Sequence, residues 1–345
     1  METWKLIVDK NVDKLQSCPQ LEKAAKELQK NEVVAFPTET VYGLGANATS
    51  DEAVAKIFKA KGRPSDNPLI VHIANTAQLH SFIHSIPKKA QILMDAFWPG
   101  PLTIIFKHKE GSLSSLVTAG LSTVAVRMPS HPVALQLLKE ANLPIAAPSA
   151  NLSGKPSPTS ATHVWEDMNG KISGIVDSGP TGVGLESTVI DCTIDIPVIL
   201  RPGGITQEQI EKLIEEVTVD QALVNEEVAP KAPGMKYTHY APDAPLYLVE
   251  GSKEKLQALI NESRQQGLKV GVLTTTENEH YYDADYLYVC GTRQDLTTVA
   301  QALYDALRYF NHTDAQIIYS ETFDYVNVGK AIMNRLLKAA GHKVI

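Results

Sequence analysis

Between residues 217 and 245 the sequence loses the periodicity that helices and strands require. The run A-P-K-A-P-G-M-K-Y-T-H-Y-A-P-D-A-P (229–245) places prolines at 230, 233, 242 and 245. Proline fixes φ and has no backbone N–H, so this run disfavours a helix and favours a stiff, extended connector. We therefore predict two domains, 1–216 and 246–345, joined by a linker over 217–245.

Composition limits the kind of protein. A chain of 345 residues, 43% hydrophobic and 21% charged, can build two globular domains with their own cores. The net charge of -7 gives no overall attraction to nucleic acid or anionic membranes, although a local basic patch is compatible with it. Cys18, Cys192 and Cys290 show no paired or metal-type spacing, and neither a signal peptide nor a membrane-length apolar run is found. We expect a soluble, cytoplasmic protein.

The segment before the linker mixes strand and helix patterns without strict alternation. Apolar runs predict strands at 33–36, 69–73, 102–106, 123–127, 145–147, 175–177, 187–191 and 198–200. Helices are predicted over 20–30, 53–61 and 132–140, two helical segments are predicted before the turn W-P-G-P (98–101), and a further helix opens at the capping box Thr206-x-x-Gln209. A second capping box, Thr49-x-x-Glu52, is expected to open helix 53–61, which should end at Gly62. The pattern indicates an α/β domain with a twisted, partly mixed sheet.

The segment after the linker shows a more regular succession of predicted strands and helices. Strands are predicted at 246–249, 269–273, 286–289 and 316–319, and helices at 252–266, 295–310 and 329–340. This order is typical of a smaller, Rossmann-like α/β domain.

Polar side chains gather where the predicted strands of the first domain end. The stretch P-T-E-T-V-Y-G-L (37–44) follows the apolar strand 33–36, and Gly43 and Gly45 should let the backbone turn tightly and approach a ligand. Other polar groups at strand ends are Arg127, Ser149, Asn151, Ser187, Thr188 and Arg201. Ligands of open α/β sheets bind beside the carboxyl ends of strands, so we expect one site there.

Three cationic residues lie at or just beyond the carboxyl end of the predicted helix 53–61, close to this site in the chain: Lys59, Lys61 and Arg63. Fixed cations beside hydroxyl and amide groups suit a phosphate-bearing ligand, and a separate arginine suits a carboxylate. Taken by themselves, these three cations are better explained by a helix carboxyl end, where positive charge balances the macrodipole.

Standard nucleotide and metal signatures are absent from the sequence. No G-x-x-x-x-G-K-[ST] occurs, and Gly182-Val183-Gly184 lacks the third glycine and preceding strand of a dinucleotide fingerprint. His80 and His84 have a metal-like spacing but no third ligand nearby, which favours an exposed helical pair. Asp283 and Asp285 are interpreted as a solvated loop.

Five motifs in order resemble the threonylcarbamoyl-AMP synthase family, built on the YrdC-type domain. They are P-T-E-T-V-Y-G-L (37–44), K-A-K-G-R-P-S-D-N-P-L (59–69), S-A-N (149–151), L-E-S-T-V-I-D (185–191) and R-P-G (201–203). The linker and the domain after it look like the long, two-domain form of the family. The resemblance implies a nucleotidyltransferase that joins L-threonine, bicarbonate and ATP into threonylcarbamoyl-AMP and releases pyrophosphate. It also implies Mg²⁺ bound with ATP and a partner transferase that modifies an adenosine beside the anticodon of tRNA.

The resemblance also assigns residues to two substrates, with Lys61 and Arg63 as the catalytic cations. The implied ATP-binding residues are Lys61, Arg63, Asn67, Thr123, Ser149, Asn151, Arg201, Tyr237 and His239. The implied threonine-binding residues are Thr38, Thr40, Tyr42, His72, Arg127, Ala147 and Ser187, with Arg127 pairing with the substrate carboxylate. No protein side chain is expected to hold a metal, and none needs to be a covalent nucleophile.

Two other functions fit the same domain type. An RNA-binding module would use a basic concave face, but the net charge is negative and no interleaving of aromatic and basic residues is found. Direct RNA binding stays open and is not required by the implied reaction. A carbamoyl transferase would need acylphosphatase and zinc-binding segments, for which this chain lacks both the cysteines and the length.

The linker mixes proline stiffness with Lys236, Tyr237, His239 and Tyr240. A plain tether is one interpretation. The other is that it folds across the nucleotide as a lid that excludes water from the carbamate and the adenylate, anchored at its far end by the second domain.

Overall fold

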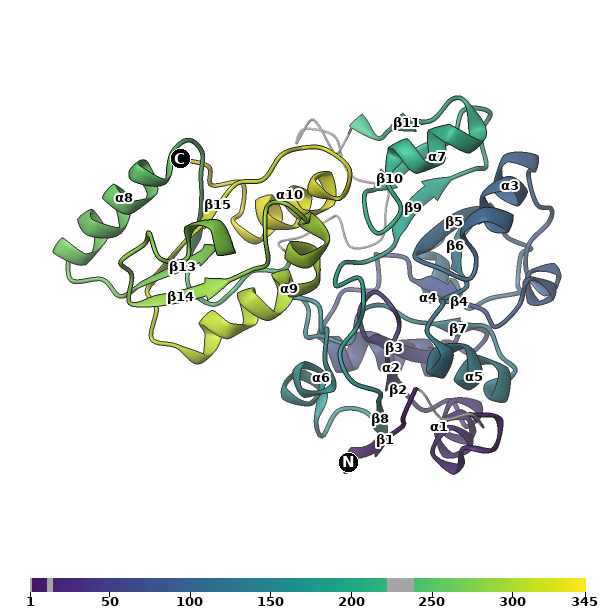
Figure 1. Ribbon diagram of the computed structural model, residues 1–345. Helices are drawn as coiled ribbons and strands as arrows, with labels where there is room; N and C mark the ends of the chain where they lie inside the picture. Colours follow the sequence, from purple (N-terminus) through teal and green to yellow (C-terminus); the bar gives the residue numbers. More distant parts are fainter. Residues whose placement is uncertain (1, 11–14, 222–238) are drawn as a thin grey trace. The chain divides into compact units, whose positions relative to one another are not determined.

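The computed structural model describes residues 2–10, 15–221 and 239–345, and its described part divides into two compact units. The first unit comprises residues 1–153, 158–182 and 186–236, and the second comprises 154–157, 183–185 and 237–345. Each unit is built around its own sheet (Figure 1). The predicted α/β class, with a mixed sheet first and a Rossmann-like domain second, is confirmed.

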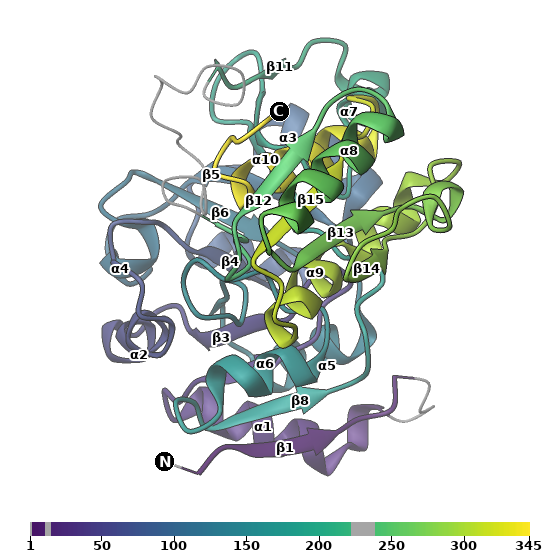
Figure 2. The same ribbon diagram turned by 90° about the vertical axis from the view of Figure 1, so that its left-hand side faces the viewer.

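The first unit contains an eleven-stranded mixed sheet in the order β1-β8-β2-β3-β7-β4-β6-β5-β9-β10-β11. Its strands are β1 (Trp4–Ile7), β2 (Val34–Phe36), β3 (Gly43–Asn47), β4 (Ile70–His72), β5 (Leu102–Lys107), β6 (Thr123–Arg127), β7 (Ile145–Ala146), β8 (Gly174–Asp177), β9 (Thr188–Asp191), β10 (Val198–Arg201) and β11 (Thr218–Val219). Its α-helices are α1 (Pro19–Gln29), α2 (Asp51–Lys61), α3 (Lys88–Phe97), α4 (Ser115–Thr118), α5 (Pro132–Ala141), α6 (Ala161–Met168) and α7 (Gln207–Ile214). Figure 2 shows β1 beside β8, its parallel partner.

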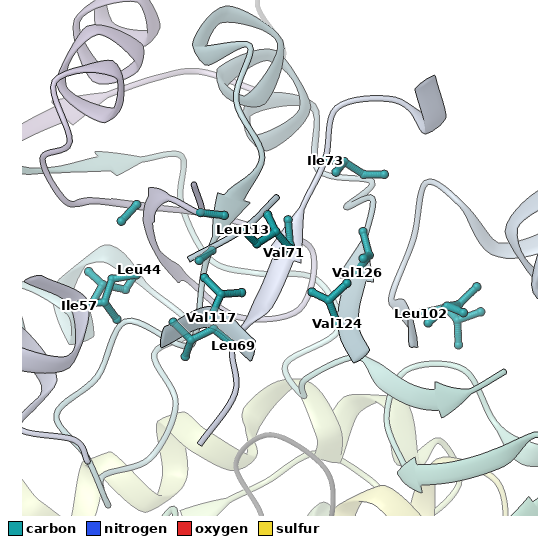
Figure 3. Packing of buried hydrophobic residues seen from close by; sticks show 14 of the residues in the cluster. Leu44, Ile57, Leu69, Val71, Ile73, Leu102, Leu113, Val117, Val124 and Val126 are labelled. Carbon is teal, nitrogen blue, oxygen red and sulfur yellow. The ribbon is translucent and has the colours of Figure 1, made fainter. Parts of the chain in front are cut away.

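Apolar side chains of this sheet form two large cores and a smaller cluster made by Ile70, Ile105, Ala125, Val189 and Leu200. Leu21 and Leu28 of α1 pack with Val133 and Leu137 of α5 and with Phe36 of β2 on one face. The larger core takes in Ile57 of α2, Leu93 of α3, Val164 of α6 and Ile210 of α7, together with strand residues such as Val71 and Val126 (Figure 3). Because side chains alternate along a strand, the short strands can serve both cores and the sheet is covered on both sides.

The boundaries of α2 differ at one end from the sequence-based prediction. The helix ends at Gly62, whose φ of 61° is left-handed, as expected. Its N-cap is Ser50 rather than Thr49, because the Ser50 hydroxyl accepts from the Ala53 N–H at 3.2 Å while the Thr49 hydroxyl donates to Asn47 at 2.8 Å. The capping box predicted at Thr206 and Gln209 is confirmed.

The expected turn at Gly43 and Gly45 is wrong, because both glycines lie inside strand β3. This strand pairs antiparallel with β2, with Ala35 opposite Leu44. The close approach is real: a Cβ at Gly45 would lie 2.7 Å from the Phe36 ring. The glycine is needed for packing beneath an aromatic ring, and the segment G-L-G-A-N carries no β-branched residue that would have indicated a strand.

The second unit contains a four-stranded parallel sheet in the order β12-β15-β13-β14. Its elements are β12 (Leu246–Val249), α8 (Lys253–Gln265), β13 (Val270–Thr274), β14 (Tyr286–Val289), α9 (Leu296–Tyr309), β15 (Ile317–Glu321) and α10 (Val328–Ala339). Leu256 and Ile260 of α8 pack with Val270 and Val272 on one face. A Cβ at Gly271 would lie 2.8 Å from Phe310, just past the end of α9, so α9 covers the opposite face.

The linker predictions fall mostly outside the described residues. Lys236 and Tyr237 belong to the undescribed segment 222–238, so the proposed lid has no structural description here. Tyr240 is described and 5% exposed, with its ring centroid 5.2 Å from that of Tyr304 and 5.9 Å from the Arg335 guanidinium carbon. The carboxyl end of the linker is therefore packed into the second unit.

Candidate active site

Arg127 is the best-defined cation of the first unit. It ends β6, is 4% exposed, and lies in register with His72 of β4 on one side and Thr103 of β5 on the other. Its Nη1 donates to the Thr40 hydroxyl at 2.7 Å and its Nε donates to the Gly100 carbonyl at 3.3 Å. A guanidinium held this firmly by three segments of chain is preorganised to bind a carboxylate.

The carboxylate of Glu39 lies against the same guanidinium. Its Oε1 is 2.6 Å from Nη2 of Arg127, and the Glu39 side chain is 13% exposed. Burial alone would raise the pKa of Glu39, but the charge and the hydrogen bond of Arg127 outweigh it and lower the pKa below its ordinary value. Glu39 is therefore ionised at neutral pH and forms an ion pair with Arg127.

His72 is buried beside Arg127 and is held neutral. Burial and then the charge of Arg127 lower the pKa of His72 to about 3. Among the described residues, Nδ1 of His72 has no hydrogen-bond partner. A neutral imidazole with a buried, unsatisfied nitrogen is suited to a hydrogen bond with a ligand.

Hydroxyl groups line both sides of Arg127. Thr38 and Thr40 share a 2.9 Å hydrogen bond between their hydroxyls. On the other side, the Ser187 hydroxyl lies 2.7 Å from that of Thr103, and Arg201 Nη2 donates to the Ser187 carbonyl at 2.9 Å. Arg201, assigned with ATP on sequence grounds, is thus held against Ser187, which was assigned with threonine.

Lys61 lies in a second polar region, at the carboxyl end of α2. It is 2% exposed, and its Nζ donates to the carbonyls of Ser149 at 2.6 Å and Asn151 at 2.7 Å. Arg63 Nη2 reaches the Asn67 carbonyl at 3.5 Å, and Asn67 is fully buried. The structure therefore brings the K-A-K-G-R-P and S-A-N motifs together, as expected of a nucleotide site.

The mixed sheet separates the two regions. β4 and β6 are parallel, so His72 and Arg127 share one end of the sheet, and Thr123 lies at the other end of β6, about 13 Å along the strand. β7 runs antiparallel to β4, so Ser149 and Asn151 follow it toward the end where Thr123 lies. The polar groups that follow strand ends therefore lie toward both ends of β4 and β6, because these short strands do not all point the same way.

Two residues assigned to threonine, Tyr42 and Ala147, also have structural partners in the first unit. The Tyr42 phenol is fully buried and donates to the Gly179 carbonyl at 2.7 Å, and burial together with Asp177 raises the pKa of Tyr42. Ala147 donates its N–H to the Ile70 carbonyl at 2.9 Å, which continues the β-ladder. Of the linker residues assigned to ATP, Tyr237 is outside the described residues, and the His239 ring stacks at 5.6 Å on Tyr240 within the second unit.

Sequence reasoning missed Glu39 and Thr103 as members of the site. Glu39 stands in the octet between the two assigned threonines, and its isolated carboxylate was the available signal. Thr103 lies inside the apolar run L-T-I-I-F, where a single hydroxyl between buried residues is the only sign.

Within residues 2–10, 15–221 and 239–345, no cluster of three or more His, Cys, Asp or Glu could hold a metal ion. Across the same ranges, no helix is both long and apolar enough to cross a membrane.

Comparison with known proteins identifies the family. Residues 26–203 match the family model described as telomere recombination, and residues 205–341 match that of the threonylcarbamoyl-AMP synthase C-terminal domain. The threonylcarbamoyl-AMP synthase of Bacillus subtilis (strain 168) is 59% identical over 345 residues, which is 100% of both chains. The chain belongs to the threonylcarbamoyl-AMP synthase family. It is accordingly an enzyme of the nucleotidyltransferase type, and the resemblance drawn from its five motifs is confirmed.

Solved structures of this family and fold agree with the observed architecture. The crystal structure of Pyrococcus abyssi Sua5 complexed with L-threonine is 46% identical, with a TM-score of 0.93 and 99% of both chains covered. Escherichia coli YciO is 23% identical with a TM-score of 0.50, covering 59% of this chain and 95% of its own, and shows the fold of the first unit alone.

Proposed function

We propose that this chain condenses L-threonine, bicarbonate and ATP into threonylcarbamoyl-AMP, releasing pyrophosphate. The observation that carries the proposal is the pair of polar regions in one unit. Arg127 forms a buried carboxylate-type site at one end of β4 and β6, and Lys61 with Arg63 forms a phosphate-type site linked to S-A-N. A synthase of this family must bring together two ligands, an amino acid that carries a carboxylate and a nucleotide that carries phosphates.

The threonine side is proposed to consist of Thr38, Thr40, His72, Arg127 and Ser187. Arg127 would pair with the carboxylate and exchange part of its contact with Glu39, and the neutral His72 would offer its buried Nδ1. The related Pyrococcus abyssi protein was crystallised with L-threonine, which supports an amino-acid site in this fold. Tyr42 and Ala147 would shape the pocket through packing.

The ATP side is proposed to consist of Lys61, Arg63, Asn67, Thr123, Ser149 and Asn151. Arg201, Tyr237 and His239 keep the nucleotide role that the family motifs imply, although Arg201 lies against Ser187. Magnesium would come bound to the phosphates of ATP, where hydroxyl and carbonyl oxygens are compatible with its preference for oxygen ligands. It would supply charge neutralisation of the phosphate oxygens.

The residues make chemical sense of the reaction. The amine of threonine condenses with bicarbonate to a carbamate and water, and a carbamate oxygen then bonds to the α-phosphorus of ATP as the bond to pyrophosphate breaks. Both partners are anionic, so the protein's task is to align them and cancel charge. Arg127 at the carboxylate and Lys61 with Arg63 at the phosphates would do this without a covalent enzyme intermediate.

The biological setting follows from the family. We propose that the product passes to a transferase that modifies an adenosine next to the anticodon of tRNA, in the cytoplasm. Cys18, Cys192 and Cys290 are free thiols, which suits a reducing compartment. The division into 1–216, a linker over 217–245 and 246–345 is proposed on the same basis, and the two family-model matches meet near residue 204.

Pyrophosphate release measures the proposal directly. The purified full chain, given ATP and magnesium, should release pyrophosphate only when threonine and bicarbonate are both present. Serine serves as the matched control amino acid, because it lacks only the methyl group of threonine. Release of the same size without threonine or without bicarbonate would refute the proposed reaction.

A further inference from the structure

The second unit contains a cavity of about 370 Å³ that the proposed reaction does not use. It opens at the carboxyl ends of the parallel strands. The segment 249–253 after β12 and the segment 321–324 after β15 form two of its walls, and Asn278, Tyr282 and Arg293 from the loops after β13 and β14 complete it. Its lining is almost entirely polar, which sets it apart from a packing defect in a core.

The cavity lies at the point where the winding of the sheet reverses. From β12 the chain passes through α8 to β13, on the far side of β15. From β15 it passes through α10 in the opposite direction, and its last residues pair with β12 on the outer edge, where Val344 bridges to Leu248. Adjacent strands whose connections leave in opposite directions form the crevice where open α/β sheets bind ligands.

The floor of the cavity is an ion pair between the buried Glu321 and the partly exposed Arg293. Glu321 is 5% exposed, and its carboxylate accepts from Asn278 at 2.6 Å, Tyr282 at 2.8 Å and Arg293 at 2.8 Å. The hydroxyls of Thr274 and Thr275 add contacts at 3.2 and 3.3 Å. Five donors fix one carboxylate, four from the end of β13 and the loop after it and one from the loop after β14, so the walls are preorganised and the charge of Glu321 is balanced by Arg293.

The remaining charges define the ligand. The charged residues of the lining are Lys253, Arg293, Glu321 and Asp324. Lys253 and the partly exposed Arg293 line the cavity from two walls, and Asp324 provides an exposed carboxylate. The Lys253 Nζ also lies 4.4 Å from the centre of the Tyr281 ring, and Arg293 also donates to the Thr322 carbonyl at 3.0 Å. Lys253 begins the 13-residue helix α8, whose first N–H groups add partial positive charge beside it. This combination suits an anion at Lys253 and hydroxyl groups at Asp324.

We propose that this cavity binds a phosphorylated sugar, either a free sugar phosphate or the sugar phosphate of a mononucleotide. The phosphate would lie between Lys253 and Arg293, and the sugar hydroxyls would donate to Asp324, as hydroxyls of a ribose do to an acidic residue in related crevices. None of the residues that line the cavity is among those proposed for the synthase reaction, so binding here does not depend on that reaction.

Titration calorimetry on the full chain tests the site with three probes: inorganic phosphate, ribose 5-phosphate and AMP. The proteins carry Arg63→Ala, which weakens the proposed ATP site. Ribose 5-phosphate and AMP should both bind more tightly than phosphate. Lys253→Gln should weaken all three by about tenfold, because a charge-assisted contact is lost. Lys255→Gln is the matched control, since its Nζ contacts the Glu250 carbonyl at 3.1 Å and it does not line the cavity.

Asp324→Asn separates the two parts of the ligand. It should weaken ribose 5-phosphate and AMP while leaving phosphate within about twofold. Equal loss in the Lys253 and Lys255 variants, absence of binding for all three probes, or equal affinity for phosphate and ribose 5-phosphate would each overturn the proposal. Since Lys253 and Asp324 are exposed, their substitution should leave folding intact, and a thermal melt verifies this.

Discussion

At the scale of single residues, Glu39 and Arg127 form the contact on which the proposed threonine site depends. Two opposite charges lie 2.6 Å apart with little exposure, so each holds the other in place. Removing one partner of a buried pair leaves the other charge desolvated and unpaired. In a variant that lacks the Glu39 charge, the carboxylate of bound threonine would pair with Arg127. Threonine should therefore stabilise that variant more than it stabilises the native protein.

We expect Glu39→Gln to lower stability by about 3 kcal/mol and to increase the stabilisation that threonine provides. The substrate carboxylate would replace the missing charge at Arg127. Thermal melts with and without threonine give both quantities. Glu52→Gln removes an equally sized acid from an exposed ion pair with Lys56 and is the control. A threonine-induced shift no larger than that of the native chain would contradict the competition.

Arg63→Ala should lower the rate of pyrophosphate release by two to three decades with the fold intact. The residue stands beyond α2, between Gly62 and Pro64, so little packing is lost. Loss of a phosphate contact in the transition state corresponds to about 2–4 kcal/mol. Lys59→Ala changes an exposed cation at the same helix end. If both variants keep near-native turnover, these cations serve the helix end instead of a phosphate.

Arg127→Ala should act differently from Arg63→Ala. It removes the group that would bind the substrate carboxylate, so its main effect should be on threonine binding. A titration with threonine at saturating ATP should show an increase in KM well above that of Arg63→Ala. An unchanged KM for threonine would place the carboxylate elsewhere.

His72 and His131 give stability a defined pH dependence. Burial is the main cause that lowers their pKa values to about 3 and about 4, from an ordinary 6.5. Below pH 6.5 the unfolded chain takes up protons that the folded chain does not, so stability falls as the pH falls. Each histidine contributes up to about 1.4 kcal/mol per pH unit, down to its folded pKa.

Urea unfolding at pH 7 and at pH 5 measures this slope. His72→Gln should reduce the loss of stability between the two pH values, although it lowers stability at both. His280→Gln, whose side chain is 94% exposed, should leave the slope as it is. A slope that is the same with and without His72 would contradict a buried, neutral imidazole.

At the scale of elements, the sequence predicted the helices and strands that have a clear side-chain pattern. It missed those that form mainly through packing against distant parts of the chain. Strands β2, β4 and β6 and helices α1, α2 and α5 were found because β-branched runs or amphipathic spacing specify them. Strands β1, β3 and β11 and helices α4 and α6 were missed. β3 forms because Gly43 and Gly45 leave room for the Phe36 ring to lie over the strand. This contact joins two different strands, so the hydrophobic pattern within 43–47 does not reveal it.

Gly45→Ala tests this explanation of β3. The added Cβ would lie 2.7 Å from the Phe36 ring, so we expect a loss of stability of about 1–3 kcal/mol. Gly182→Ala is the control, because its added Cβ would have only one neighbour, at 3.9 Å. Denaturant unfolding of both variants gives the comparison, and equal losses would contradict the packing explanation.

At the scale of the whole molecule, the motifs predicted the two polar regions but not their arrangement. Lys61 with Ser149 and Asn151, and Arg127 with Thr40, were named from strand and helix ends and lie together. Their placement at opposite ends of β4 and β6 follows from strand directions, which local sequence does not encode. The partnership of Ser187 with Thr103 is of the same kind, since it joins β5 to β9 across 84 residues.

The order of strands in the large sheet also determines when it can form. β1 pairs with β8 and β5 pairs with β9. These pairs can form only after residues 174–177 and 188–191, respectively, have been synthesised. Contacts between such distant segments slow folding, since a long loop must close before any pairing rewards it. As the chain leaves the ribosome, β5 must wait with an open, apolar edge until β9 has been synthesised. We therefore expect the first unit to be most prone to aggregation during synthesis, before β9 is available to pair with β5.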